Sequence, residues 1–328
     1  MRFGSVPLAE AEGAVLAHSL PVDGGRLRKG KRLDAADLAA LAAAGRAEVT
    51  VARLDPEDVD EDAAALALAR AVCGPGLKLQ TVGTGRVNLL AAGPGLARID
   101  AARVDAVNAT DPAITLATVP RWQRMDPRGM VATVKVIAYA VPGAALARAC
   151  GEGQGALALA APVIGTASLV QTEVGLGANS GKGEEVTRAR LERLGVALVG
   201  SRLVAHTETE LAEALTTTQG EVVLILTGSA TSDARDVAPT ALARAGGRLV
   251  HFGMPVDPGN LMFLGDLRGR PVLGLPGSSR SPALSGADWV LERLICGVPV
   301  GPAEITAMGV GGLLKEIPTR PRPRLQRG

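Results

Sequence analysis

Residues 221–239 have the sequence EVVLILTGSATSDARDVAP, and this stretch decides the fold. Its first part, residues 221–226, is almost entirely apolar and predicts a strand buried on both faces, as the strands of a parallel sheet are. The loop from Thr227 to Asp236 consists mostly of small and hydroxyl-bearing residues, and a helix containing Pro239 is expected after it. This order of strand, loop and helix indicates an α/β domain in which ligands bind beyond the carboxyl ends of the strands.

The surrounding sequence repeats the alternation of strand and helix. ALALAAPVIG and VALVGSRLVA predict strands, and EEVTRARLERLG predicts a helix that Gly195 closes. Thr207 and Glu210 predict a capping box at the start of another helix. A last helix is expected after Ser281, with Ser281 as its N-cap and Pro282 at its first position. We therefore predict an α/β fold with a doubly wound, mostly parallel sheet.

Four segments are predicted along the chain. Residues 1–72 are expected to form a small N-terminal α/β module. Residues 73–155 carry short β-favouring runs such as RVNLL and MVATVKVIAYAV, which predict a β-rich module. Residues 156–300 hold the α/β domain. Residues 301–328 form a C-terminal extension, and its Pro/Arg-rich tail is expected to be solvated and mobile.

The composition excludes several classes of protein. Apolar residues make up 47% of the 328 residues, which excludes a disordered chain, and 35 basic residues stand against 33 acidic ones, so no broad nucleic-acid-binding face is indicated. The 3 cysteines and 3 histidines lie far apart, so neither a disulfide framework nor a zinc site is expected. No signal-peptide pattern is present, and the longest uncharged stretch contains Pro162 and several hydroxyls. We expect a cytoplasmic protein that spans no membrane.

The loop after residues 221–226 has the features of an anion site. It offers backbone N–H groups and has a helix N-terminus ahead of it, and both favour a phosphate. The residues expected to cradle that phosphate are Thr227, Gly228, Ser229, Ala230, Thr231, Ser232 and Arg235. Asp233 and Asp236 add carboxylates, which repel a bare phosphate but suit a Mg²⁺ ion that bridges to one. Asp236 is also a good N-cap for the following helix, and the residue types leave these two roles even.

A second ligand loop is expected between an apolar strand and the last predicted helix. Its members are Pro276, Gly277, Ser278, Ser279 and Arg280. Gly277 permits a close backbone approach, the serines offer hydroxyl donors, and the guanidinium of Arg280 can bind a phosphate through two hydrogen bonds. A purely structural turn explains the same residues equally well.

Two further segments carry weaker signals. Pro258 and Gly259 lie in a predicted turn. A loop expected from Thr166 to Lys182 contains the sequence GLGANSG, a weak dinucleotide-binding pattern, and Leu176 stands where a Walker A loop needs glycine.

The first loop also resembles a known family. Residues 228–239, GSATSDARDVAP, are similar to the GGTGxxxRDVTP loop of the molybdopterin-binding fold, which occurs in molybdopterin adenylyltransferases of the MogA and MoaB type. The same loop resembles the GGxSxGxxD loop of molybdopterin molybdotransferases of the MoeA type. The later sequences Pro258-Gly259 and Leu275-Pro276-Gly277 resemble the PGxP and LPGNP segments of that second type. The N-terminal stretch also resembles the opening of the molybdotransferases, and the middle stretch resembles the accessory portion of molybdopterin-binding proteins that are sometimes fused to a nucleotidyltransferase.

This resemblance implies a protein of molybdenum cofactor biosynthesis. The loops would form a pocket for the phosphate and the dithiolene-bearing ring system of molybdopterin. Asp236, together with Asp233, would hold Mg²⁺ and take part in the chemistry. The implied activity is adenylyl transfer from ATP to molybdopterin, or insertion of molybdate into it. A molybdoenzyme or another cofactor-assembly protein is the expected partner, and self-association is expected.

Two departures from the family patterns leave the activity open. Ser229 replaces the second glycine of the GG pair, and a side chain there narrows the backbone approach. Residues 278–280, SSR, follow the glycine where the LPGNP pattern has Asn-Pro. Binding is expected to survive these changes better than catalysis. A non-catalytic carrier that hands the cofactor to an enzyme is therefore one alternative, and a nucleotide pyrophosphatase of the CinA type is another.

Overall fold

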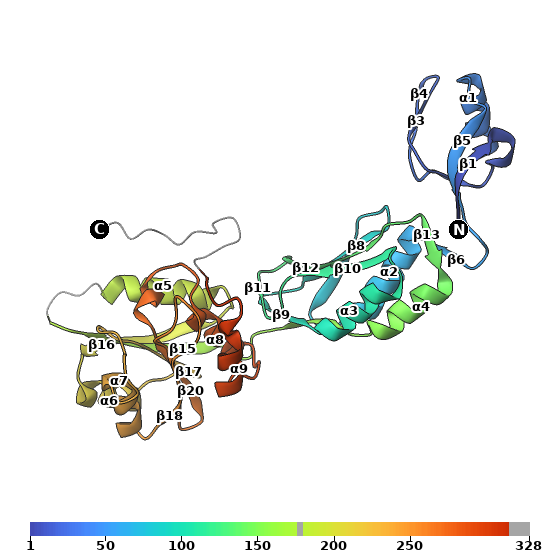
Figure 1. Ribbon diagram of the computed structural model, residues 1–328. Coiled ribbons are helices and arrows are strands. Elements are labelled where there is room, and N and C mark those ends of the chain that lie inside the picture. The colour runs from blue at the N-terminus through green and yellow to red at the C-terminus, as the bar shows by residue number, and fades with distance from the viewer. Residues whose placement is uncertain (176–179, 315–328) are drawn as a thin grey trace, which may run out of the picture. The chain divides into compact units, whose positions relative to one another are not determined.

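The computed structural model describes residues 1–175 and 180–314, and of Ser180 it describes the backbone alone. The chain forms two compact units, residues 1–93 with 97–159, and residues 94–96 with 160–328 (Figure 1). The centre of the predicted GLGANSG pattern and the Pro/Arg-rich tail lie outside the described residues. The boundaries of the four segments that the sequence predicts remain a prediction.

The first unit begins with a small antiparallel sheet and one helix. The sheet has the strand order β1-β5-β2. The elements of this part are β1 (Arg2–Pro7), η1 (Leu8–Glu10), β2 (Val15–Leu16), β3 (Leu20–Val22), β4 (Gly25–Leu27), α1 (Ala35–Ala43) and β5 (Glu48–Arg53). Helix α1 begins where the Asp34 carboxylate accepts the backbone N–H of Asp37. Leu41 of α1 packs with Val49 and Val51 of β5 in the core of this part.

The rest of the first unit has a four-stranded antiparallel sheet of order β10-β12-β8-β7. Its strands are β7 (Leu77–Thr81), β8 (Arg86–Ala91), β10 (Ile114–Thr118) and β12 (Met130–Val136). Its helices are α2 (Glu61–Val72), α3 (Ala101–Thr110) and α4 (Gly143–Glu152), which share one apolar core with the sheet. The remaining strands of this part are β6 (Asp58–Asp60), β9 (Gly95–Ile99), β11 (Arg124–Met125), β13 (Ala140–Pro142) and β14 (Leu157–Ala160).

The second unit contains a six-stranded sheet, the main sheet, of order β16-β15-β17-β20-β19-β18. Its strands are β15 (Thr166–Glu173), β16 (Ala197–Ala205), β17 (Val222–Leu226), β18 (Arg248–Phe252), β19 (Phe263–Leu267) and β20 (Arg270–Leu275). Every neighbouring pair is parallel except the two that involve β19. All residues of β17 are buried, as its apolar sequence predicts.

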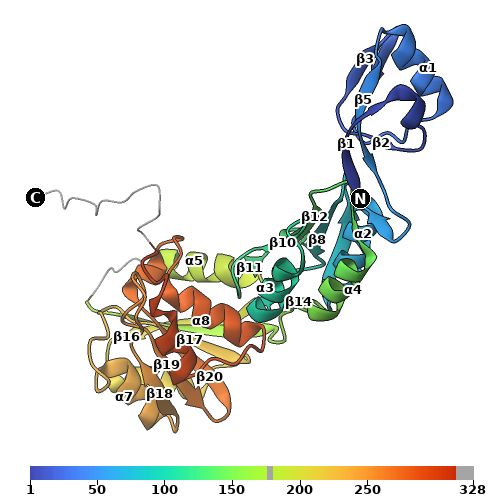
Figure 2. The ribbon, with the colours of Figure 1, turned by 45° about the vertical axis from the view of Figure 1, so that its right-hand side comes forward.

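Helices cover both faces of the main sheet. In Figure 1, α5 (Ser180–Glu192) lies on one side of it, and α6 (Glu208–Thr216) and α7 (Val237–Arg244) lie on the other. Figure 2 shows α8 (Gly286–Ile295) on the same side as α5. The short elements of this unit are η2 (Gly277–Arg280), α9 (Pro302–Thr306) and η3 (Ala307–Gly309). The predicted doubly wound, mostly parallel α/β fold, preceded by smaller mixed and β-rich parts, is confirmed.

Three local predictions were wrong. Residues 166–173, expected to start a loop, form β15, which is buried between β16 and β17 and so satisfies its backbone on both sides. Helix α8 begins after Ser285 rather than after Ser281, because the carbonyls of Ser281 and Ala283 accept hydrogen bonds from Arg190 instead of helix N–H groups. The capping box before α6 is half formed: Thr207 accepts the Glu210 N–H, but the Glu210 carboxylate bonds to the N–H of another residue.

Both outer strands of the main sheet contain a register shift. Val199 is an extra residue in β16 relative to β15, and Val250 is an extra residue in β18 relative to β19. Over the described part of the chain, no helix is both long and apolar enough to cross a membrane.

Candidate functional site

The carboxyl ends of β15, β17 and β20 lie side by side, because these three strands are parallel neighbours. The loop from Thr227 to Asp236, called the Gly228 loop below, leaves β17 at this edge. The backbone N–H of Gly228 donates to Thr172 Oγ1 of β15 at 2.9 Å. A Cβ added to Gly228 would lie 2.7 Å from the carbonyl oxygen of Thr172. Glycine is therefore required for the loop to approach the end of β15 this closely.

A histidine extends this connection to a third segment. Thr172 Oγ1 lies 2.8 Å from His206 Nδ1, and His206 follows β16. The Thr172 hydroxyl is buried and accepts the Gly228 N–H, so its one proton is available for His206 Nδ1. Neither Thr172 nor His206 is predictable from the sequence, because a single histidine without a nearby partner in the sequence carries no signal. Their contact exists only because parallel strands bring their ends together.

Hydrogen bonds from backbone N–H groups to the Asp236 carboxylate hold the end of the Gly228 loop in place. Asp236 is the N-cap of α7: its Oδ1 accepts the N–H of Val237 at 2.7 Å, and its Oδ2 accepts the N–H of Ser232 at 3.1 Å. Thr231 is buried, whereas Ser229, Ala230 and Ser232 are exposed. The loop therefore exposes several small side chains, while hydrogen bonds to Asp236 hold its backbone.

Asp233 is held by its neighbour Arg235. The Nε and Nη2 atoms of Arg235 lie 2.9 Å and 3.1 Å from the two carboxylate oxygens. Hydrogen bonds from the Arg235 side chain and backbone lower the pKa of Asp233 to about 2. Both side chains are exposed, so this pair can open at little cost.

The expected Mg²⁺ ligands do not form a metal site as they stand. Both oxygens of Asp233 bind Arg235, and both oxygens of Asp236 accept backbone N–H groups. No group of three or more His, Cys, Asp or Glu side chains that could hold a metal occurs in residues 1–175 and 180–314. A Mg²⁺ ion at Asp233 would first have to displace Arg235.

The second predicted loop lies against the first. Arg280 Nη2 donates to the carbonyl oxygen of Thr227 at 2.9 Å, which joins η2 to the start of the Gly228 loop. Arg280 is partly buried, and burial lowers the pKa of its guanidinium below the usual value. Among the described residues no carboxylate pairs with it. A partly buried cation without an anion is costly, so this position favours an anionic ligand.

Two of the unsatisfied polar atoms of the second unit belong to the same loop. Four buried side-chain oxygens in the second unit have no hydrogen-bond partner within the described structure: Gln171 Oε1, Ser278 Oγ, Ser279 Oγ and Ser285 Oγ. Gln171 lies near the end of β15, and Ser278 and Ser279 belong to η2. Each such atom costs about 1–3 kcal/mol unless a ligand or water satisfies it. A Cβ added to Gly277 meets nothing within 4 Å, so space remains open beside them.

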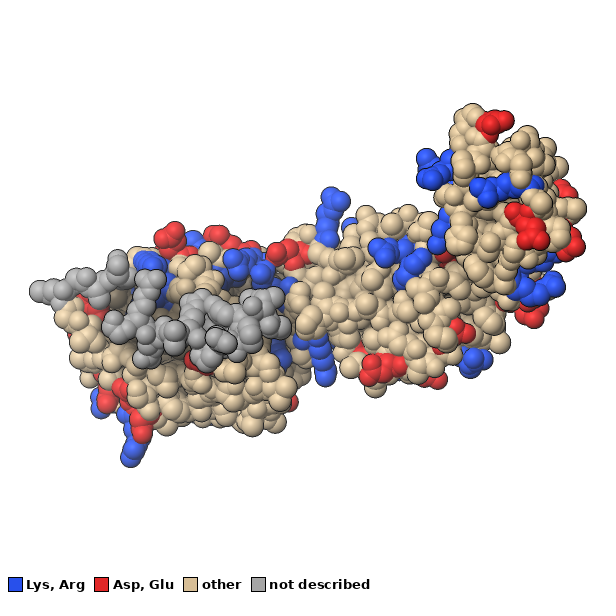
Figure 3. All heavy atoms as spheres, turned by 45° about the horizontal axis from the view of Figure 1, so that its top comes forward, with Lys and Arg blue, Asp and Glu red and all other residues tan. Residues whose placement is uncertain are grey.

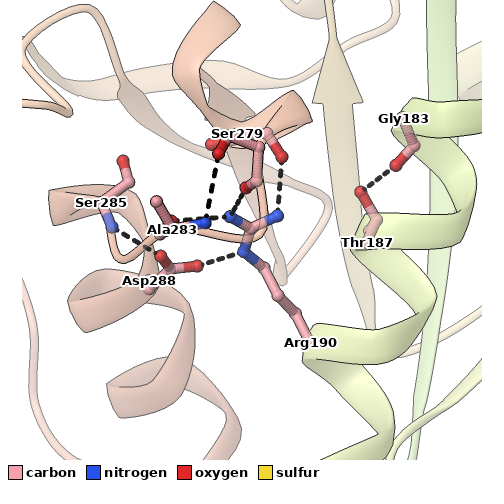
Figure 4. Close-up of polar contacts among 8 residues, drawn as sticks. Gly183, Thr187, Arg190, Ser279, Ala283, Ser285 and Asp288 are labelled. Carbon is pink, nitrogen blue, oxygen red and sulfur yellow. Dashed lines mark hydrogen bonds and ion pairs between the residues drawn. The ribbon is translucent and has the colours of Figure 1, made fainter.

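Arg190 of α5 holds the backbone of residues 279–283 in place through hydrogen bonds to its carbonyls (Figure 4). Its Nη1 donates to the carbonyl of Ser279 at 2.6 Å, and its Nη2 donates to the carbonyls of Ser281 at 2.6 Å and Ala283 at 3.2 Å. Its Nε donates to Asp288 Oδ1 at 2.5 Å, and both side chains are 10% exposed. No local pattern in the sequence pointed to Arg190 or Asp288.

Pro258 and Gly259 lie in a different part of the unit. The Asp257–Pro258 peptide bond is cis, and the Pro258 carbonyl accepts the N–H of Gly286 at 2.8 Å. A Cβ on Gly259 would lie 2.7 Å from the backbone nitrogen of Gly286, so this turn packs on the start of α8. The structure thus joins the Gly228 loop and η2 directly, whereas the turn supports α8.

Charge marks no binding site on one face of the molecule. On the face shown in Figure 3, basic and acidic side chains are interspersed.

Comparisons with known proteins match the part of the chain that contains these loops. Residues 170–295 match a family described as a probable molybdopterin binding domain, and this match confirms the predicted resemblance. Residues 5–53 match a domain of unknown function (DUF8806). A solved structure, the molybdopterin biosynthesis MoeA protein from Pyrococcus horikosii, aligns with 91% of this chain and 76% of that chain at 13% identity and a TM-score of 0.32, which is too low to support an inference. No curated protein matches the sequence.

Proposed function

We propose that this protein binds molybdopterin and acts in molybdenum cofactor biosynthesis, because residues 170–295 match the family described as a probable molybdopterin binding domain. The site is the edge of the main sheet where the Gly228 loop meets η2. The observation that carries this proposal is Arg280, a partly buried cation that has no carboxylate partner among the described residues and lies next to two unsatisfied hydroxyls. Such a group fits the phosphate of the pterin.

In this assignment the loops have different roles. Arg280 and the hydroxyls of Ser278 and Ser279 bind the phosphate, and Pro276 and Gly277 leave room for it. The remaining ligand residues are Thr227, Gly228, Ser229, Ala230, Thr231, Ser232 and Arg235 of the Gly228 loop, with Pro258 and Gly259 supporting α8. A ring system that extends from the phosphate along the sheet edge would lie over the exposed, small residues of the Gly228 loop.

The geometry favours binding over turnover. Asp233 and Asp236 are the residues expected to hold Mg²⁺ and to take part in adenylyl transfer or molybdate insertion, and both carboxylates are already used within the loop. A carrier that delivers molybdopterin to a molybdoenzyme, or to another assembly protein, needs no such metal. We therefore propose the carrier role ahead of the catalytic one. A cytoplasmic location and self-association belong to the same proposal.

The test is an anaerobic titration with molybdopterin, followed by the change in pterin absorbance. The wild type is compared with Arg280→Met, which keeps the apolar stem and removes the charge. A hydrogen bond to a charged group contributes about 1.5–3 kcal/mol, so the affinity should fall roughly ten- to hundredfold. The matched control is Arg270→Met: Arg270 also donates to backbone carbonyls, at 2.9 Å and 3.3 Å, but at the opposite edge of the main sheet. Equal affinity of Arg280→Met and the wild type would refute the site.

The same titration separates carrier from enzyme. It is repeated with Mg²⁺, with ATP and with molybdate, and with Asp236→Asn beside the wild type. A carrier binds molybdopterin equally well in all four conditions and forms no adenylylated or metal-containing product. Mg²⁺-dependent product formation that Asp236→Asn abolishes would establish the transferase role instead. Binding of nucleotides without binding of molybdopterin would exclude both.

A further inference from the structure

We propose that Arg190 is a positioning residue of the anion site, which it shapes from the opposite side of the η2 loop without touching the ligand. This inference rests on the proposed function, because it names the group that holds Arg280 in place. Arg190 belongs to α5, and it reaches a segment about 90 residues later in the chain.

The first step is the pattern of its acceptors. The carbonyl oxygens that Arg190 binds belong to Ser279, Ser281 and Ala283, which are alternate residues of one segment. Three carbonyls that converge on one planar guanidinium fix the direction of three peptide groups at once. Figure 4 shows the guanidinium between this segment and Asp288.

The second step concerns the peptide between Ser279 and Arg280. In a trans peptide the carbonyl and the following N–H point in opposite directions. Because the Ser279 carbonyl points to Arg190, the N–H of Arg280 points away from α5. The Arg280 side chain then reaches the Thr227 carbonyl on the Gly228 loop. Arg190 therefore determines how both polar groups of Arg280 are presented.

The third step is the buried ion pair. Asp288 binds Arg190 Nε through one oxygen and the N–H of Ser285 through the other, at 2.5 Å and 2.7 Å. This fixes the rotation of the guanidinium and joins it to the start of α8. Buried ion pairs stabilise a fold little compared with apolar replacements, so stability alone does not explain this one. Its geometric effect is to keep residues 281–284 out of the helix and within the loop.

The experiment separates loop position from stability. Arg190→Lys keeps the charge beside Asp288 but lacks the planar fork that serves three carbonyls. Its matched control is Arg188→Lys on the same helix, because Arg188 forms an exposed pair with Glu184. Two quantities are measured: the hydrogen exchange of the amides of Ser279 and Ser281 in the free protein, and the affinity for molybdopterin and for pyrophosphate.

We expect Arg190→Lys to exchange these two amides at least fivefold faster and to bind both ligands at least tenfold more weakly. Arg188→Lys should match the wild type in both respects. Unchanged exchange and affinity in folded Arg190→Lys would overturn the proposal. Faster exchange with unchanged affinity would also overturn it, because Arg190 would then serve the fold alone. If the wild type binds neither ligand, the proposed function fails, and faster exchange in the variant still supports the part of the inference that concerns loop position.

Discussion

The Thr172 hydroxyl connects the Gly228 loop to His206, and removing it should loosen the site without leaving a cavity. Thr172→Val keeps the side-chain shape and replaces the hydroxyl with a methyl group. The Gly228 N–H then loses the acceptor that lies 2.9 Å away, and His206 Nδ1 loses its partner at 2.8 Å. Thr172 is 2% exposed and the new methyl group takes the place of the hydroxyl, so water cannot readily supply the lost acceptor.

The expected magnitude follows from these contacts. An unsatisfied, partly buried backbone donor costs about 1–2 kcal/mol, at the lower end of the range for buried groups. In a domain of roughly 150–250 residues, 1 kcal/mol shifts the melting temperature by about 2–4 °C. The second unit falls in that size range, so Thr172→Val should lower its melting temperature by roughly 2–8 °C.

Calorimetry of the full chain measures this shift, and Thr172→Ser is the matched control because it keeps the oxygen. Thr172→Ser should lose less stability than Thr172→Val and should retain the Gly228 contact. His206→Asn should also lose little, since its amide oxygen can replace Nδ1 as the acceptor. If Thr172→Val and Thr172→Ser melt at the same temperature, the hydroxyl does not hold the loop and the reasoning fails.

Three further predictions follow from single groups. Gly228→Ala should lower the melting temperature more than Gly277→Ala. A Cβ at Gly228 would lie 2.7 Å from the Thr172 carbonyl oxygen, whereas a Cβ at Gly277 meets nothing within 4 Å. Equal shifts in melting temperature would contradict the close approach of the Gly228 loop to β15. Asp233 should titrate near pH 2 by NMR, so its contribution to stability is present above about pH 4 and disappears as the pH falls towards 2. In Arg235→Ala the pKa of Asp233 should rise towards 3.8 without reaching it, because the backbone N–H of residue 235 still donates to the carboxylate; an unchanged pKa would show that the Arg235 side chain does not bind Asp233. Burial and the nearby Glu292 raise the pKa of the Cys296 thiol to about 12. At pH 8 iodoacetamide should therefore leave this thiol unmodified until the protein unfolds, as measured by mass spectrometry. Labelling of Cys296 in the folded protein would disprove its burial.

The alternation of strands and helices in the second unit is predictable because each element buries its own face. The apolar run 222–226 needs helices on both sides, and Gly195 ends α5 with a positive φ of 72°. Such signals are local in sequence. Helix α3 was missed because, apart from its alanines, its only apolar residues are Val104 and Val107, which are buried, so the sequence shows little of a helical pattern.

Features that depend on distant partners were not predictable from local patterns. Ser281-Pro282 is a good helix start by residue type, yet Arg190 removes the carbonyls that the first turn would use. The contact between Thr172 and His206 likewise needs the register of two neighbouring strands. The loops of the site were found from their composition, but the side chains that hold them were not. Those side chains act across 34 to 98 residues of sequence.

The extra residues in β16 and β18 limit how copies of this protein can associate. An outer strand with an unbroken row of free N–H and C=O groups is a template for another chain. Val199 and Val250 interrupt that row at both ends of the main sheet. The sheet is therefore poorly suited to grow by adding strands from a second copy. Association of two copies through the second unit would then bury helices or loops instead of the outer strands of the main sheet.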